Sequence, residues 1–223
     1  MDSADLARHY PRLYHMAEAG SWDSIELHGL LSTGALLDLF EVDDAKRATI
    51  LRQRRPVSVP LAHDMHGAAV VRDQVPLREG PLRSCLTDMS LEEWLELLNS
   101  RVFFWLDEPH LETLLGAGAY RERAHDVIYV DTAALVARHV EEIRLSPINS
   151  GATLYNPRPR GSGTFMTVAQ YPFEDRRKAR GVANAIVELA VEGGVRDIRD
   201  VATRVERRRA GGAVDYVIWE PAP

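Results

Sequence analysis

The sequence has little of what a secreted, membrane-bound or metal-clustered protein requires. Its single cysteine, Cys85, excludes an internal disulfide and a cysteine-based metal cluster. No apolar run approaches the roughly 18 residues of a membrane-spanning helix. The first ten residues, MDSADLARHY, lack the basic segment and apolar core of a secretion signal. These absences predict a cytoplasmic protein without a membrane segment.

The familiar nucleotide-binding, protease and esterase motifs are missing as well. The sequence contains no G-x-G-x-x-G, G-x-x-x-x-G-K-[ST], H-E-x-x-H or G-x-S-x-G. His63 and His66 have the spacing of a metal-binding pair, but Asp64 is the one acid close to them in the chain. That pattern favours a solvated loop, and we expect no metal site.

What is present is ordinary globular composition. Of 223 residues, 45% are hydrophobic and 27% charged, which is enough to bury a sizeable core, and we expect a single domain over 1–223. The net charge of −6 argues against indiscriminate binding to nucleic acid and leaves room for a local basic patch.

The order of apolar and polar residues predicts an α+β fold without regular strand–helix alternation. The segment 57–81, rich in Pro, His and Gly, is expected to be irregular. Ser90 and Glu93 form a capping box ahead of an amphipathic helix. Helices are expected at 33–40, 43–54, 90–99, 112–121, 132–143 and 174–183. Strands are expected at 101–105, 126–132, 164–171 and 186–191, with a terminal hairpin from 201–207 and 213–220.

The stretch 13–32, LYHMAEAGSWDSIELHGLLS, has the pattern of a cradle for a ligand. A short apolar strand carries His15, and a small-residue turn leads to a short helix that ends at Gly29. Ser21 or Asp23 is expected to cap that helix. A histidine in such a place is more often a satisfied structural residue than a catalyst, so spacing alone does not define an enzyme.

Glu188 and two polar segments are the other candidate functional elements. An acid inside the strand 186–191 is disfavoured unless it faces solvent or has a function, and the pattern alone favours the solvent-facing position. Arg72 and Gln74 either bind a polar ligand or tie a loop together. The loop 146–163 is rich in hydrogen-bond donors, and it is either a substrate-facing loop or a plain surface loop. Its candidate substrate residues are Asn149, Ser150 and Arg160.

Several segments resemble, in the right order, those of the ADP-ribosyltransferase superfamily, above all DarT-type DNA ADP-ribosyltransferases. His15 is followed by a helix and by 29–32 (GLLS), which is similar to that family's G-L-L-S turn. The segments 102–105 (VFFW) and 188–191 (ELAV) resemble its V-x-F-Y-F strand and the strand with its catalytic glutamate. The pattern GLLS … RDQ-x-P-L … LN-x-R-V-F-F-W also resembles a group of bacterial domains of unknown function. The family's H-I-T is HMA here.

The resemblance implies a split mixed or antiparallel sheet flanked by helices, with NAD bound in the cleft between its halves. It implies that Glu188 is the catalytic carboxylate. It also implies that His15, Ser32 and Arg54 or Arg55 contact NAD, and Arg72 and Gln74 are further candidate cofactor-binding residues.

The same resemblance implies transfer of ADP-ribose from NAD to an acceptor, with nucleic acid favoured, and a possible antitoxin or immunity partner. Two other functions stay open. One is an RNA 2′-phosphotransferase-like activity, and the other is a non-catalytic nucleotide- or nucleic-acid-binding module on the same scaffold. Whether Glu188 shares a cleft with His15 or points into solvent distinguishes catalysis from the binding module.

Overall fold

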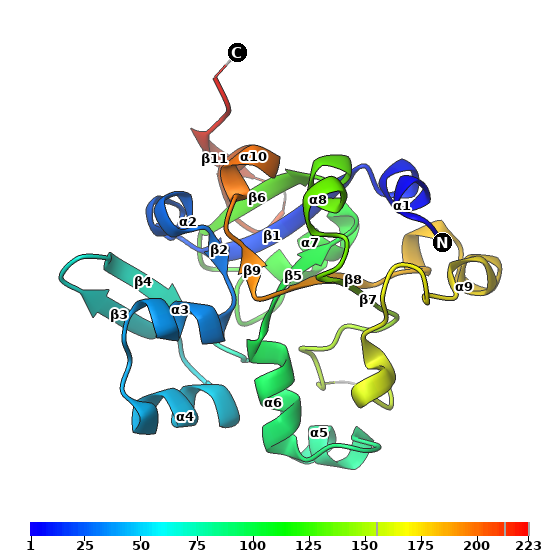
Figure 1. Cartoon of the computed structure of the whole chain (residues 1–223), viewed down its shortest axis with the longest axis horizontal. Coiled ribbons are helices and arrows are strands. Elements are labelled where there is room, and N and C mark those ends of the chain that lie inside the picture. The colour runs from blue at the N-terminus through cyan, green and yellow to red at the C-terminus, as the bar shows by residue number, and fades with distance from the viewer. Residues whose placement is uncertain (155, 212, 223) are drawn as a thin grey trace.

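A seven-stranded antiparallel sheet forms the centre of the computed structural model (Figure 1), which describes residues 1–154, 156–211 and 213–222. Its strand order is β11-β10-β6-β1-β5-β8-β7, and each described neighbouring pair is antiparallel. The strands are β1 (Arg12–Glu18), β5 (Arg101–Trp105), β6 (His125–Asp131), β7 (Ile143–Ser146), β8 (Glu188–Glu192), β10 (Ala202–Arg208) and β11 (Val214–Trp219). The α+β class expected from the sequence is confirmed.

Two small sheets, ten α-helices and two short 3₁₀ helices, Ser162–Thr164 and Val182–Asn184, complete the described part of the chain. β2 (Leu30–Leu31) pairs with β9 (Gly194–Val195), and β3 (Val59–His63) pairs with β4 (Gly67–Val71). The helices are α1 (Ser3–His9), α2 (Trp22–His28), α3 (Thr33–Leu39), α4 (Asp44–Arg52), α5 (Glu79–Cys85), α6 (Leu91–Asn99), α7 (Glu108–Leu115), α8 (Thr132–His139), α9 (Phe173–Arg180) and α10 (Ile198–Val201). Among the described residues, no helix combines the length and apolarity needed to cross a bilayer.

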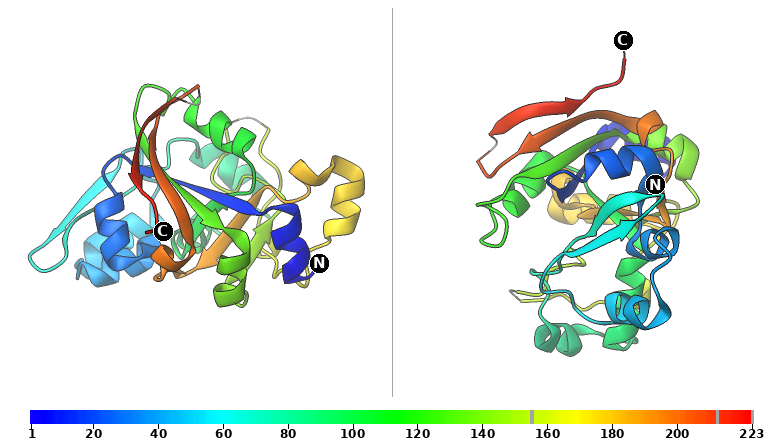
Figure 2. Two further views of the ribbon diagram at one scale, coloured as in Figure 1. Left: turned by 90° about the horizontal axis from the view of Figure 1, so that it is seen from above. Right: turned by 90° about the vertical axis from the view of Figure 1, so that its left-hand side faces the viewer.

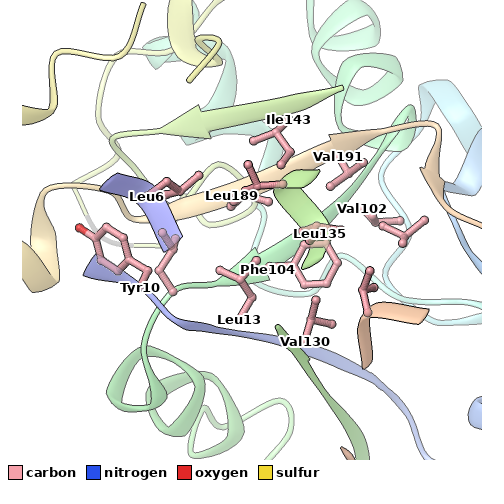
Figure 3. Close-up of a cluster of buried hydrophobic side chains, with 14 of the residues drawn as sticks. Leu6, Tyr10, Leu13, Val102, Phe104, Val130, Leu135, Ile143, Leu189 and Val191 are labelled. Carbon is pink, nitrogen blue, oxygen red and sulfur yellow. The ribbon is translucent and has the colours of Figure 1, made fainter. Parts of the chain in front are cut away.

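Helices cover both faces of the central sheet, so most of its strands are buried. Side chains from α1, α8 and α10 pack on one face, where Phe104 and Leu189 join the largest apolar cluster (Figure 3). On the opposite face, α7 covers β1 and β6, whereas α5 and α6 pack near Phe103 and Ala190. A fourth cluster joins α3, α4 and the β3–β4 hairpin, which lie to one side of the sheet (Figure 1).

The helix expected at 132–143 ends at His139, and Ile143 already begins β7. Three other expected elements differ more from the structure. The segment 57–81 is not irregular, because it contains β3, β4 and the start of α5. The strand expected at 164–171 is wrong: only Met166 bridges Leu145, and the Thr167 hydroxyl accepts from the backbone N–H of Gln170 in a turn. The helix expected at 112–121 instead spans Glu108–Leu115, because Asp107 caps it through the His110 N–H.

The β1–α2 turn is held by a carboxylate that comes from elsewhere in the chain. Asp126, fully buried on β6, accepts hydrogen bonds from the backbone N–H groups of Gly20 (2.9 Å) and Trp22 (3.2 Å). Ser21 is the N-cap residue but makes no side-chain cap. Asp126 therefore provides what Ser21 or Asp23 was expected to provide.

Gly29, which ends α2, has a positive φ that residues with a side chain adopt only with strain. Its φ is +88°, and a Cβ added there would lie 2.5 Å from the Cα of Arg196. This close approach lets β2 turn directly out of α2 and pair with β9.

Candidate functional site

The central sheet is nearly divided between β1 and β5. β1 pairs with β6 along its whole length, but its described pairing with β5 is limited to Tyr14 opposite Trp105. On the other side of β5, pairing with β8 again runs along the whole strand. The sheet therefore consists of two well-paired parts that meet at one residue pair.

A cavity of about 330 Å³ lies where these two parts separate. Its walls come from β1, β5, β4, the α2–β2 connection and the loop around Asn149. This volume is within the range of small-molecule sites. Of the residues predicted to act in a site, it is lined by His15, Arg55, Arg72, Gln74, Asn149, Ser150 and Glu188.

His15 presents a neutral imidazole to this cavity. Its Nδ1 lies 2.8 Å from the carbonyl oxygen of Phe103, so Nδ1 carries the proton and donates it there. Burial lowers the pKa of His15 to about 4, against a smaller opposing effect of that hydrogen bond. At neutral pH the lone pair on Nε2 is therefore available as an acceptor, and none of the described residues bonds to it.

Glu188 lies in the same cavity and is only 5% exposed. Its Oε2 accepts a hydrogen bond of 2.9 Å from the backbone N–H of Ser150. Burial raises the pKa of Glu188 to about 7, although Ser150 and the charge of Arg160 act in the opposite direction. The solvent-facing position favoured by the strand pattern is wrong, because β8 lies between β5 and β7 with both faces covered.

Arg72 is a half-buried cation that lines the cavity. Its guanidinium donates to the carbonyl of Met16 and lies 4.6 Å from the ring centre of Tyr120. Burial lowers the pKa of Arg72, yet an arginine remains charged at neutral pH. Gln74 lies beside it and accepts from the backbone N–H of Arg55. The segment therefore ties the loop together, and its two polar side chains also line the cavity.

Two of the expected NAD-contacting arginines are used within the fold. The buried guanidinium of Arg55 donates to the Asn99 side chain (2.9 Å) and to the carbonyls of Ile50 and Arg72. Arg54 donates to the carbonyls of Leu77 and Val75 and does not line the cavity. Neither side chain is arranged as an open fork for a pyrophosphate.

Ser32 and Arg160 were expected to contact NAD and the substrate, but neither lines this cavity. Ser32 is outside the cavity lining, because its hydroxyl caps α3 by accepting from the Ala35 N–H at 3.2 Å. Arg160 is buried and donates to the Ser150 carbonyl at 2.8 Å. It lines a second cavity, together with Arg158, Asn149, Arg176 and Arg180 among others.

Sequence reasoning did not identify several polar residues of the site. Tyr120 donates to Asp73 at 2.8 Å, and both line the cavity. Asn99 and Trp105 line it too, one at the end of α6 and the other at the end of β5. Tyr120 follows α7 in a segment of turns and carries no periodic signal. Trp105 was recognised as part of a buried strand, and only the strand order places it beside Glu188.

The described residues contain no group of three or more metal-ligating side chains arranged around one point. His63 and His66 stack on each other, with ring centres 4.7 Å apart. They lie with His28 around Phe40, away from the cavity lining.

Residues 11–202 match the model of a family of unknown function, DUF7002, and the chain belongs to this family. No curated protein matches the chain. The matched range contains His15, Glu188 and every other residue of the cavity lining.

Proposed function

We propose that this protein is an ADP-ribosyltransferase-like enzyme that uses NAD as a substrate. The observation that carries the proposal is that His15 and Glu188, far apart in the sequence, line one cavity where β1 and β5 separate. The ordered resemblance of the segments around these residues to the ADP-ribosyltransferase superfamily supports the same function. A split sheet with the ligand at the split is also what that resemblance implies.

The residues present fit a dinucleotide that carries both hydroxyls and anionic groups. The Nε2 lone pair of His15 suits a ribose hydroxyl donor. Arg72 offers a half-buried guanidinium in the cavity lining, and guanidinium groups form strong charge-assisted hydrogen bonds with phosphate oxygens. The apolar lining from Ile25, Leu31 and Val71 suits the flat faces of the bases. Arg72 thus replaces Arg54 and Arg55 as the proposed pyrophosphate contact.

Glu188 would act on the sugar carbon that loses nicotinamide. As the C1′–N bond breaks, its electron pair goes to the nicotinamide nitrogen and positive charge develops at C1′. A carboxylate held in a buried site stabilises such a charge more than one in water. The acceptor then forms the new bond to C1′ and releases a proton. The ionised form of Glu188 is the active one in this scheme.

The acceptor is proposed to carry phosphates, as the resemblance to DNA-modifying enzymes implies. Arg158 and Arg180 line the second cavity, and Asn149 lines both cavities. Positive charge next to the reaction site would attract a phosphodiester strand in spite of the net charge of −6.

The test is to titrate NAD by calorimetry and to measure nicotinamide release by the wild type and by Glu188→Gln. Glu192→Gln is the matched control, because Glu192 lies on the same strand but outside the cavity lining. We expect binding in both Glu188 forms and a loss of release of at least 100-fold in Glu188→Gln alone.

Three outcomes would contradict this function. Binding of NAD without release, in the presence of single-stranded DNA, RNA and protein acceptors, would favour the non-catalytic nucleotide-binding module. No binding at millimolar NAD would refute the ADP-ribosyltransferase proposal. Release of 2′-phosphate from RNA in place of ADP-ribose transfer would favour the phosphotransferase alternative.

A further inference from the structure

Arg160 and Glu188 are two buried charges that are joined through the backbone at Ser150. Their exposed fractions are 3% and 5%. The Ser150 N–H donates to the Oε2 of Glu188 at 2.9 Å, and the Ser150 carbonyl accepts from the guanidinium of Arg160 at 2.8 Å. The carbonyl of Asn149 lies 3.5 Å from the same guanidinium nitrogen. The loop residue Ser150 thus lies between a cation and an anion.

The direction of these hydrogen bonds is favourable at both ends. The negative carbonyl oxygens face Arg160, and the positive N–H group faces the carboxylate of Glu188. Isolated buried charges are costly unless they are paired or hydrogen-bonded. In the described part of the chain, Glu188 is the carboxylate whose charge acts on Arg160.

We propose that Arg160 is a positioning residue, which fixes the loop 149–151 and thereby the carboxylate of Glu188 in the cavity. The effect of Arg160 on catalysis rests on the proposed function. The effect of Arg160 on the carboxylate of Glu188 rests on the geometry alone. It replaces the substrate contact that the sequence suggested for Arg160, because the guanidinium is buried and already engaged by backbone carbonyls.

Other charged side chains line the two cavities. Glu18, Arg55, Arg72, Asp73 and Arg101 line the one that Glu188 faces, and Arg158, Arg176 and Arg180 line the second one with Arg160. Among these charges, that of Arg160 is the one that acts on Glu188. Cys85 from α5 lies beside Arg160, and the ring centre of Trp94 on α6 lies 5.9 Å from its guanidinium. His15 from β1 lines the cavity that Glu188 faces and is uncharged at neutral pH. Removing the cation at 160 should therefore raise the pKa of Glu188.

The decisive experiment follows the ionisation of Glu188 in the free protein by infrared difference spectroscopy. The band of its protonated carboxyl is assigned by its loss in Glu188→Gln. In Arg160→Gln we expect the titration midpoint of Glu188 to rise by about one pH unit, since a nearby opposite charge lowers a carboxyl pKa by about that much or more. Arg160→Met tests the same change with a different side chain, in case glutamine weakens the fold.

Two further variants separate a specific effect from a general one. Arg160→Lys keeps the cation and should return the midpoint to within a few tenths of the wild-type value. Arg83→Gln removes an exposed cation of α5, paired only loosely with Glu92 at 3.8 Å, and should leave the midpoint unchanged. A folded Arg160→Gln or Arg160→Met protein with the wild-type midpoint would overturn the proposal.

Nicotinamide release gives the second readout. A midpoint that rises from about 7 to about 8 lowers the ionised fraction of Glu188 at pH 7 about fivefold. We therefore expect kcat of Arg160→Gln to fall about fivefold at pH 7 and to recover by pH 9, with KM for NAD little changed. If the wild type does not turn over NAD, the proposed function fails, while the infrared titration still decides the role of Arg160.

Discussion

Replacing Glu188 by glutamine should stabilise the protein above neutral pH and have no such effect in acid. Burial raises the pKa of Glu188 from an ordinary value of 4.5 to about 7. The folded protein therefore binds a proton more tightly than the unfolded chain. Stability contributed by that proton is fully present below pH 4.5 and is lost as the pH rises to 7.

The magnitude follows from the two pKa values. Each unit of pKa difference between the folded and unfolded states corresponds to about 1.4 kcal/mol. The rise from 4.5 to about 7 thus destabilises the fold by about 3 kcal/mol once the carboxyl is ionised. Glutamine keeps the shape and an oxygen acceptor for the Ser150 N–H, but carries no charge.

The assay is urea unfolding of the wild type and Glu188→Gln at pH 5 and pH 8. At pH 8 the variant should be more stable by about 3 kcal/mol, which for a chain of this length raises Tm by about 6 to 12 °C. At pH 5 most of this difference should disappear. Glu92→Gln, on the exposed side of α6, is the control and should change stability little at either pH. An equal effect of Glu188→Gln at both pH values would refute the reasoning.

Three other predictions concern the turn, the glycine and the reaction. Asp126→Ala should lower the free energy of unfolding by about 3 kcal/mol in urea, because it leaves Arg207 and the N–H groups of Gly20 and Trp22 without their acceptor; a loss below about 1 kcal/mol would contradict this. Gly29→Ala should cost at least about 2 kcal/mol in thermal unfolding, because its Cβ would collide with the backbone of Arg196, whereas Gly20→Ala, with open space around it, is the milder control. Nicotinamide release should rise with pH through a midpoint of about 7, as Glu188 ionises, with no second transition between pH 5 and 7, because the pKa of His15 is about 4; a bell-shaped profile over that range would contradict these roles.

Local patterns predicted the elements that depend on local forces. The capping box of Ser90 and Glu93 and the apolar face of α6 were visible in the sequence, and the structure confirms both. The aromatic strand at 101–105 and the terminal hairpin were also predicted within a residue or two. The β3–β4 hairpin was missed because its strands bury few side chains and include Pro60.

The site could be predicted only in part, because its contacts join distant segments. The environment of Glu188 depends on the position of β8 between β5 and β7 and on the hydrogen bond from the Ser150 N–H. The alternation of polar and apolar residues along one strand predicts neither of these. Arg54 and Arg55 have the right charge for a pyrophosphate, but only the fold reveals that backbone carbonyls occupy their guanidinium groups. The role of Asp126 could not be predicted either, because this carboxylate comes from β6 and accepts the N–H groups of a turn that is distant in the sequence.

The position of β10 has a practical consequence for work with fragments of this family. The family match ends at Ala202, where β10 begins, although β10 pairs along β6 (Figure 2). The side chains of Val205 and Arg208 on this strand are buried. A fragment cut at the end of the match would leave β6, His125–Asp131, with an unpaired edge of exposed N–H and C=O groups. Such an edge of apolar, β-branched residues is a template for pairing with other chains. Fragments of this kind should aggregate, whereas the chain with its last hairpin protects that edge with its own strand.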